Sequence, residues 1–182
     1  MKIIAFYLPQ FYPTPENDEW WGKGFTEWTN VAKAKPLFPG HNQPRVSADL
    51  GFYDLRLPTV REEQVRLAKE AGIDGFCYWH YWFNGRRLLD RVFSEVVESG
   101  KPDFPFCLCW ANHSWSMKTW DPSRPNKLLI EQTYPGKNDF EAHFYAMLPA
   151  FKDPRYIRHK GKLLFGVFDT RGMTVAETKK LF

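Results

Sequence analysis

The chain has no long hydrophobic run, no block of like charge and only three cysteines. Its first apolar stretch, residues 3–8, is too short for the apolar region of a secretory signal, and no stretch is long enough to cross a membrane. Lys and Arg alternate with Asp and Glu, and the net charge is +4. We therefore expect no secretory segment, no membrane span and no nucleic-acid surface, which would need clustered positive charge.

The three cysteines, Cys77, Cys107 and Cys109, lie in apolar, strand-like runs. An odd number in such runs predicts reduced core thiols in a cytoplasmic protein. Cys107 and Cys109 would share one strand face near His113, but a fourth ligand is missing, so packing is favoured over a metal site. No cofactor is predicted, and the lack of a Gly-rich phosphate loop or an Asp-x-Asp triplet argues against a soluble nucleotide-sugar donor.

Aromatic residues make up 18% of the chain, and many lie outside helix or strand patterns. In the densest cluster, residues 75–86, an apolar run passes directly into Trp, Tyr, His, Asn and Arg. A pyranose ring has a weakly polar C–H face and a rim of hydroxyls. Flat aromatic faces and directional polar groups match these two features, so the cluster predicts a sugar site.

Four short apolar runs, 3–8, 75–79, 104–110 and 163–168, are nearly continuous, as expected of strands covered on both faces. Helices are predicted between them, at about 59–71 after a capping box at Thr59–Glu62, at about 88–98 before Gly100, and at about 139–151. Pro149 should bend or shorten the third. A second capping box, Thr174 to Glu177, starts a fourth helix. This alternation predicts the α/β class, with parallel strands.

A complete (β/α)₈ barrel takes about 250 residues, so four strand–helix units form either an open sheet or half a barrel. The long connection 9–58 follows the first strand and is rich in aromatic residues. It favours the barrel, because loops at that end of the strands build barrel active sites. We therefore predict one domain over residues 1–182, the first half of a (β/α)₈ TIM barrel.

Four stretches match a known family in order. They are residues 5–11 (Ala-Phe-Tyr-Leu-Pro-Gln-Phe), 17–31 (with Trp-Trp-Gly-Lys-Gly-Phe-Thr-Glu-Trp), 75–86 and 106–112 (Phe-Cys-Leu-Cys-Trp-Ala-Asn). The chain resembles the bacterial WbsX-type proteins, named as glycosyltransferases of lipopolysaccharide O-antigen clusters and related by fold to glycoside hydrolase family 99 endo-mannosidases. The resemblance implies a TIM barrel acting on glycans. It also implies catalytic carboxylates in an Asn-Glu-Trp-x-Glu-Gly-like segment late in the barrel, which this sequence lacks.

The chain departs from the family pattern at three places. His113 follows Trp-Ala-Asn where a Glu is common, and Tyr12 stands where a His is common. Phe168 is followed by Asp169, Thr170 and Arg171 instead of by Arg-Pro. These changes alter hydrogen-bonding groups at strand ends, so the substrate preference could differ from that of better-known family members.

Reaction at a glycosidic bond develops positive charge at the anomeric carbon and uses a pair of carboxylates. The candidates are Glu27, Glu131 and Asp169. Glu27 could instead cap a helix or form an ion pair, and Asp169 could cap a turn. Asp121, before Pro122, is interpreted mainly as a turn residue.

The predicted function is that of a carbohydrate-active protein making or cleaving glycosidic bonds in bacterial surface polysaccharide. A non-catalytic glycan-binding half-barrel or an inactive fragment is the alternative. The expected partner is a glycan, and self-association is expected if half a barrel stands alone. The residues predicted to bind substrate are Tyr7, Gln10, Trp20, Trp21, Glu27, Trp28, His80, Tyr81, Trp82, Asn84, Trp110, Asn112, His113 and Trp115.

Overall fold

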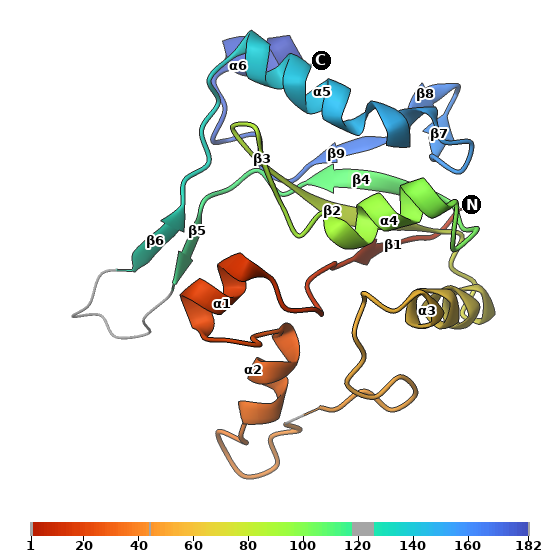
Figure 1. The fold of residues 1–182 in the computed structure, drawn as a ribbon, viewed down its shortest axis with the longest axis vertical. Helices are drawn as coiled ribbons and strands as arrows, with labels where there is room; N and C mark the ends of the chain where they lie inside the picture. Colours follow the sequence, from red (N-terminus) through yellow and green to blue (C-terminus); the bar gives the residue numbers. More distant parts are fainter. Residues whose placement is uncertain (1, 44, 118–125, 182) are drawn as a thin grey trace.

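The computed structural model describes residues 2–43, 45–117 and 126–181. Its main sheet contains four parallel strands that lie side by side in chain order (Figure 1). They are β1 (Ile4–Tyr7), β2 (Gly75–Phe83), β4 (Phe106–Trp110) and β9 (Phe165–Val167). In a doubly wound sheet the strand order reverses at a switch point. Parallel strands that alternate with helices confirm the α/β prediction. Because the strand order does not reverse here, the arrangement is that of a barrel segment.

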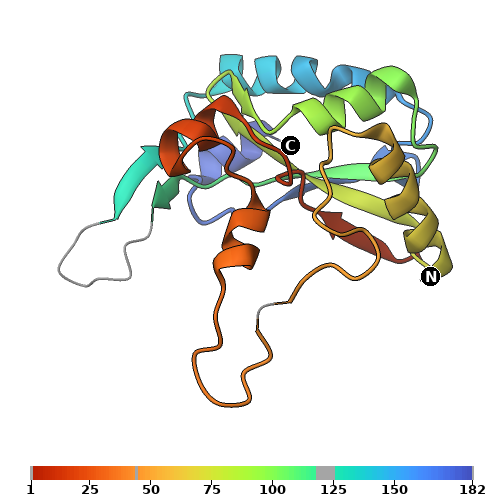
Figure 2. The same cartoon turned by 60° about the horizontal axis from the view of Figure 1, so that its bottom comes forward.

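One face of the sheet is covered by three helices, α3 (Pro58–Glu70), α4 (Arg91–Ser99) and α5 (Lys137–Lys152), which lie along the same side in Figure 2. Tyr78 of β2 points to this face, and its ring centroid is 5.2 Å from that of Phe93 in α4. Phe165 of β9 lies in register on the same face, 6.0 Å from Phe151 of α5. The main core therefore lies between the sheet and these helices.

The opposite face, called the open face here, has no helix of the described residues packed along it (Figure 2). Its strand residues include Phe6, Cys77, Trp79, Cys107, Cys109 and Gly166. Phe6 stacks on Trp79 at 4.8 Å yet remains 66% exposed. The prediction that the strands are covered on both faces is confirmed for the central strands β2 and β4, where almost every residue is buried. It is wrong for the outer strands β1 and β9, whose residues are mostly half-buried or exposed. As predicted, the three cysteines are free and buried, with two of them on one face of β4.

Strand β2 is longer than predicted and turns back as a hairpin. Asn84 and Gly85 have φ values of 45° and 83°, the left-handed backbone of a two-residue hairpin turn. The chain returns as β3 (Arg86–Leu88), where Leu88 pairs with Tyr81. The following helix, α4, consequently begins at Arg91 and not at Leu88, while Gly100 follows its end as predicted.

The predicted capping boxes have different outcomes. Helix α3 begins at Pro58, before the predicted Thr59 box, and its N-cap residue Leu57 makes no side-chain capping bond. Proline at the first helical position supplies the helical φ instead. The second box is confirmed, because the Glu177 backbone N–H donates to Thr174 Oγ1 at 3.2 Å and the Thr174 N–H donates to Glu177. It starts α6 (Val175–Leu181).

Helix α5 runs through Pro149 to Lys152, so Pro149 does not shorten the helix, which was one of its two predicted effects. Pro149 lies in the last turn on the exposed side. At this exposed position water can donate the hydrogen bond that proline, which lacks a backbone N–H, cannot.

Beyond the main sheet, the described residues form two small hairpins. They are β5 (Trp115–Met117) with β6 (Lys127–Ile130), and β7 (Arg158–His159) with β8 (Lys162–Leu163).

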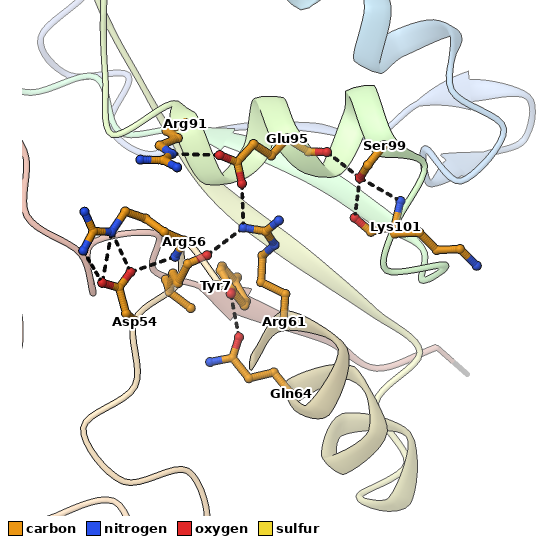
Figure 3. Close-up of polar contacts among 10 residues, drawn as sticks. Tyr7, Asp54, Arg56, Arg61, Gln64, Arg91, Glu95, Ser99 and Lys101 are labelled. Atoms are coloured by element: carbon orange, nitrogen blue, oxygen red, sulfur yellow. Dashed lines mark hydrogen bonds and ion pairs between the residues drawn. The ribbon is translucent and has the colours of Figure 1, made fainter. Parts of the chain in front are cut away.

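The connection between β1 and α3 contains two short helices, α1 (Pro15–Trp21) and α2 (Glu27–Lys33). Its end is held by Arg61 of α3, a buried residue whose Nη1 donates to the Leu55 carbonyl at 2.7 Å and pairs with Glu95 of α4 at 2.9 Å (Figure 3). A buried guanidinium needs such partners. Arg61 thus fixes the long connection against two helices.

No helix in the described part of the chain is both long and apolar enough to span a membrane.

Candidate functional site

A cleft of about 480 Å³ lies among α1, α2 and the β5–β6 hairpin. The α1–α2 segment follows β1, and the hairpin follows β4, so both extend from the carboxyl ends of parallel strands. Figure 1 shows them next to one another beyond that edge of the sheet. The cleft is lined by Gln10, Asn17, Trp20, Trp21, Phe25, Glu27, Asn30, His113, Ser114, Trp115, Ser116, Asn126 and Leu129.

The local sequence of the α1–α2 segment explains how it forms one side of the cleft. Thr14 caps α1 by accepting a bond from the Asn17 N–H, and Pro15 occupies the first turn. Asp18 Oδ1 accepts from the Gly24 N–H at 2.8 Å and closes the turn that follows. Thr26 then caps α2, which places Glu27 in its first turn. Two capped short helices thus replace what would otherwise be a long loop.

Aromatic rings form the apolar part of the cleft. Trp20 meets Trp115 edge to face at 6.0 Å, and Trp21 stacks beside Phe25 at 5.7 Å. Trp115 also packs on Tyr81 of β2, 5.0 Å away. Trp21 is 43% exposed, so its ring is open to a ligand. Such rings can stack on the C–H face of a sugar.

Polar groups lie beside these rings. Gln10 Nε2 donates to Tyr81 Oη at 2.9 Å, and burial raises the pKa of that phenol, so it stays protonated. Burial also raises the pKa of Glu27, against the opposing effect of a hydrogen bond from the Asn30 side chain. The pKa of His113 is lowered by burial, with Asp169 opposing. Near neutral pH the imidazole of His113 is therefore neutral, and Glu27 is the one acid among the described lining residues.

The structure gathers six of the predicted substrate-binding residues in this cleft, and Tyr81 lies directly behind it. The six are Gln10, Trp20, Trp21, Glu27, His113 and Trp115. The sequence did not lead us to predict the other lining residues, which are Asn17, Phe25, Asn30, Ser114, Ser116, Asn126 and Leu129. Only Asn17, Phe25 and Asn30 carried a usable signal, because they lie in the aromatic connection that was already singled out.

Three other predicted residues lie away from the cleft. Tyr7 is buried on the helix-covered face and donates to Gln64 Oε1 at 2.6 Å (Figure 3). Trp28 packs on Phe11 within the long connection, and its Nε1 donates to the Tyr53 carbonyl at 2.8 Å. Asn84 forms the exposed β2–β3 turn.

His80, Trp82 and Trp110 lie in a buried cluster between the sheet and α5. His80 Nε2 is 2.7 Å from His143 Nε2, and Trp82 stacks on the His143 ring at 4.8 Å. Trp82 Nε1 donates to Asp139 Oδ1 at 3.0 Å. His80 and Trp82 were expected at the barrel mouth because β2 was predicted to end at residue 79, whereas the strand continues through them. Trp110 was expected there as the last residue of the third strand, but its side chain is fully buried.

Asn112 joins the ends of β4 and β9. Its Oδ1 accepts from the Asp169 N–H at 2.9 Å, and its Nδ2 donates to Tyr134 Oη at 2.9 Å. Asp169 accepts three bonds from Arg171, which lower the pKa of its carboxyl to about 2. Asp169 thus closes a turn outside the cleft lining, and Glu131 is exposed and also outside it. Asp121 lies outside the described residues.

Among residues 2–43, 45–117 and 126–181, no three His, Cys, Asp or Glu side chains are grouped so that they could hold a metal ion. The described lining residues of the cleft offer hydrogen bonding, stacking on aromatic rings and proton exchange at Glu27 and His113.

Parallel strands in chain order and helices on one face define the class as half of a (β/α)₈ barrel. The cleft lies beyond the strand carboxyl ends, where barrel proteins have their active sites. The family model "Glycosyltransferase WbsX" matches residues 3–182, and the chain belongs to this family. The family resemblance found in the sequence is thereby confirmed.

The chain is 49% identical over 158 residues to the "Uncharacterized protein WxcX" of two strains of Xanthomonas campestris pv. campestris. The match covers 86% of this chain but 22% of WxcX, so the chain spans about a fifth of the curated relatives. Two structures of the GH99 endo-alpha-mannosidase from Bacteroides thetaiotaomicron share its fold, with TM-scores of 0.52 and 0.51. Their sequence identities are 16% and 17%, and the matches cover 92% and 91% of this chain but 42% and 44% of those proteins.

Proposed function

We propose that residues 1–182 are the N-terminal half of a carbohydrate-active barrel whose cleft binds a glycan. The barrel would make or cleave glycosidic bonds in bacterial surface polysaccharide of the O-antigen type. The observation that carries the proposal is the grouping of Trp20, Trp21 and Trp115 with amide side chains at the carboxyl end of a parallel sheet. Membership of the WbsX glycosyltransferase family and the GH99 fold likeness support the same class of ligand.

The cleft's contribution would be to bind and position the sugar. Stacking on Trp21 would hold the C–H face of a ring, while Gln10 and Asn30 offer planar donors and acceptors to hydroxyls. The volume, about 480 Å³, falls within the range of about 300–1,000 Å³ usual for small-molecule sites.

Catalysis would need a second carboxylate. A glycosidase-type mechanism uses two, and among the described lining residues only Glu27 carries one. In this proposal Glu27 contacts substrate, and the carboxylates that act on the glycosidic bond come from the later part of the barrel, as the family resemblance implies. The free cysteines fit a reducing compartment, so the proposal places the protein in the cytoplasm.

Among the described lining residues Glu27 is the one acid, which also favours a second candidate, a glycan-binding module without turnover. The two candidates differ in product formation. A bound oligosaccharide that is cleaved or extended by the purified protein supports the enzyme, and tight binding with unchanged glycan supports the module.

The test is a Trp21→Ala variant assayed on an array of bacterial oligosaccharides. Loss of one stacked ring should weaken glycan binding by about tenfold or more, since truncating an aromatic anchor of a binding site typically costs about 1–2 kcal/mol or more. Tyr145→Ala is the matched control, because Tyr145 is a 66% exposed aromatic residue on α5, outside the cleft. Equal binding by both variants would reject the cleft as the glycan site.

A further inference from the structure

The connection between α2 and α3 carries an exposed apolar turn. Figures 1 and 2 both show the segment after α2 extending away from the sheet. Leu37 in this segment is 84% exposed and its neighbour Phe38 is 59% exposed. The whole of residues 36–40, called the apolar turn here, is exposed. Two adjacent large apolar side chains at a projecting turn are typical of a surface that contacts a membrane or another protein.

The apolar turn is held in shape by its own contacts. The Leu37 N–H donates to His41 Nδ1 at 3.1 Å, and the His41 N–H donates to the Phe38 carbonyl at 3.1 Å. The Phe38 and His41 rings stack with their centroids 4.4 Å apart. Pro36 and Pro39 fix two further backbone angles. The turn is therefore formed before it meets a partner, which lowers the entropy cost of binding.

Basic residues flank the apolar turn on both sides. Lys33, the last residue of α2, and Lys35 precede it, and Arg45 follows it. All three are exposed. The sequence from residue 28 to residue 48 contains no Asp or Glu. This part of the connection therefore joins an apolar tip to three positive charges with no acid beside them in the sequence.

A bilayer with anionic lipids matches both features. The boundary between headgroups and acyl chains accepts apolar side chains, and the lipid phosphates attract Lys and Arg. A lysine can lay its aliphatic stem along apolar surface while its ammonium group reaches the headgroups. A stable protein contact usually buries about 800 Å² on each partner, which is more surface than a five-residue turn presents. The apolar turn thus suits a bilayer better than a protein partner.

We propose that the apolar turn attaches the protein to an anionic phospholipid surface. Leu37 and Phe38 enter the bilayer at the level of the headgroups, and the three flanking bases bind lipid phosphates. This is attachment to one face of a membrane, without a span. It goes beyond the proposed function and does not depend on glycan binding. The cytoplasmic leaflet, which is rich in anionic lipids, fits the compartment proposed above.

The attachment would also place the cleft near the membrane. Helix α2 contributes Glu27 and Asn30 to the cleft and ends where the segment carrying the apolar turn begins. Its seven residues span about 10 Å. A glycan held at the membrane surface would therefore lie within reach of the cleft.

The experiment is co-sedimentation of the purified chain with lipid vesicles. One set contains phosphatidylcholine alone, and the other contains phosphatidylcholine with about 30% phosphatidylglycerol. At ~0.1 M NaCl we expect binding to the anionic vesicles that is about tenfold or more tighter than binding to the neutral ones. Most of this binding should be lost at ~1 M NaCl, because salt screens the charges. Binding to neither set, or equal binding to both, would overturn the proposal.

A double variant tests the apolar part. Leu37→Ser combined with Phe38→Ser should weaken binding to the anionic vesicles by about tenfold or more, because two apolar side chains no longer leave water. The matched control combines Phe6→Ser with Phe168→Ser, two exposed positions on the open face. That pair should bind as the unmodified chain does. Loss of binding in the open-face pair with retention in the turn pair would refute the turn as the attachment site.

A second pair of variants tests the charges. Lys33→Gln with Lys35→Gln should weaken binding to the anionic vesicles by about tenfold. Lys160→Gln with Lys162→Gln, at exposed positions of the β7–β8 hairpin, makes the same change in net charge and should have little effect. An equal loss in both pairs would mean that net charge alone drives binding, and the proposal would fail.

Two further readouts separate this proposal from its alternatives. If the Leu37→Ser and Phe38→Ser variant sediments as a smaller species than the unmodified chain without vesicles, the turn is a contact between copies and the proposal is overturned. Its glycan binding should be unchanged, since neither residue lines the cleft. Glycan binding without vesicle binding would therefore refute the membrane attachment alone, and vesicle binding without glycan binding would refute the proposed function alone.

Discussion

His80 and His143 form a buried pair whose Nε2 atoms are 2.7 Å apart, with the Trp82 and Trp110 rings against His143. In the neutral pair one Nε2–H donates to the other nitrogen, whereas protonation of both imidazoles would set two donors against each other. Burial lowers both pKa values, that of His143 to about 3, and the positive charge of Arg87 acts in the same direction.

This pair predicts a loss of stability in mild acid. Both imidazoles are neutral in the folded state, while an unfolded histidine takes up a proton below about pH 6.5. The free energy of unfolding is therefore not reduced by this pair above that pH. At lower pH it should fall by up to about 1.4 kcal/mol per pH unit for each histidine. Asp139, the other titratable group in the cluster, has a pKa raised by burial and offsets part of this fall at the lower pH values.

The measurement is urea unfolding between about pH 5 and pH 8. His143→Gln keeps a hydrogen-bonding partner for His80 but removes one titrating group, so it should shrink the slope. His159→Gln, at an exposed position, is the control and should leave the slope intact. A slope that is the same in all three proteins would contradict this account.

At the scale of elements, the β2–β3 hairpin depends on Gly85, whose φ is 83°. Gly85→Ala should destabilise the fold by about 1–2 kcal/mol because an L side chain is strained there. Glycan binding should persist, since the hairpin turn does not line the cleft.

Urea unfolding and array binding together check this prediction. Gly172→Ala is the control, because a Cβ at Gly172 would meet Tyr134 Oη at an ordinary 3.5 Å without positive φ. Equal stability of the two variants, or loss of binding by a folded Gly85→Ala protein, would contradict it.

The hairpin also explains which part of the site could be predicted. Hydrophobic runs located the four parallel strands, and the aromatic connection located Trp20, Trp21 and Glu27. The end of β2 was misplaced because aromatic residues continue through it. Side chains alternate between the two faces of a strand, so His80 and Trp82 point away from Tyr81. Ser116 and Asn126 were missed because no local pattern reveals which side chains a hairpin brings to a distant loop.

At the scale of the whole molecule, the open face exposes aromatic surface that a complete barrel would enclose. Phe168, 57% exposed, packs against Trp79 at 5.5 Å and extends the stack that begins at Phe6. Strands β1 and β9 each have one side unpaired within the main sheet. Exposed apolar surface and unpaired strand edges favour association.

We therefore predict that residues 1–182 self-associate. Sedimentation velocity should show dimers or larger species that shrink when Phe6 and Phe168 are both changed to Ser. Phe52→Ser, at another 57% exposed aromatic position, should have no such effect. A monomer at all concentrations for the unmodified chain would contradict both this prediction and the proposed half-barrel.

The strand order of the sheet also has a consequence for biosynthesis. Each of β2, β4 and β9 pairs with a strand that precedes it in the chain. A strand leaving the ribosome therefore finds its neighbour already made, and the sheet can grow in one direction during translation. The insertion that builds the cleft wall lies between the first two strands, and lengthening it adds only logarithmically to the entropy of joining them. A longer loop between β1 and β2 would therefore add little to the free-energy cost of pairing these strands. It would also leave unchanged the order in which the strands of the sheet are made.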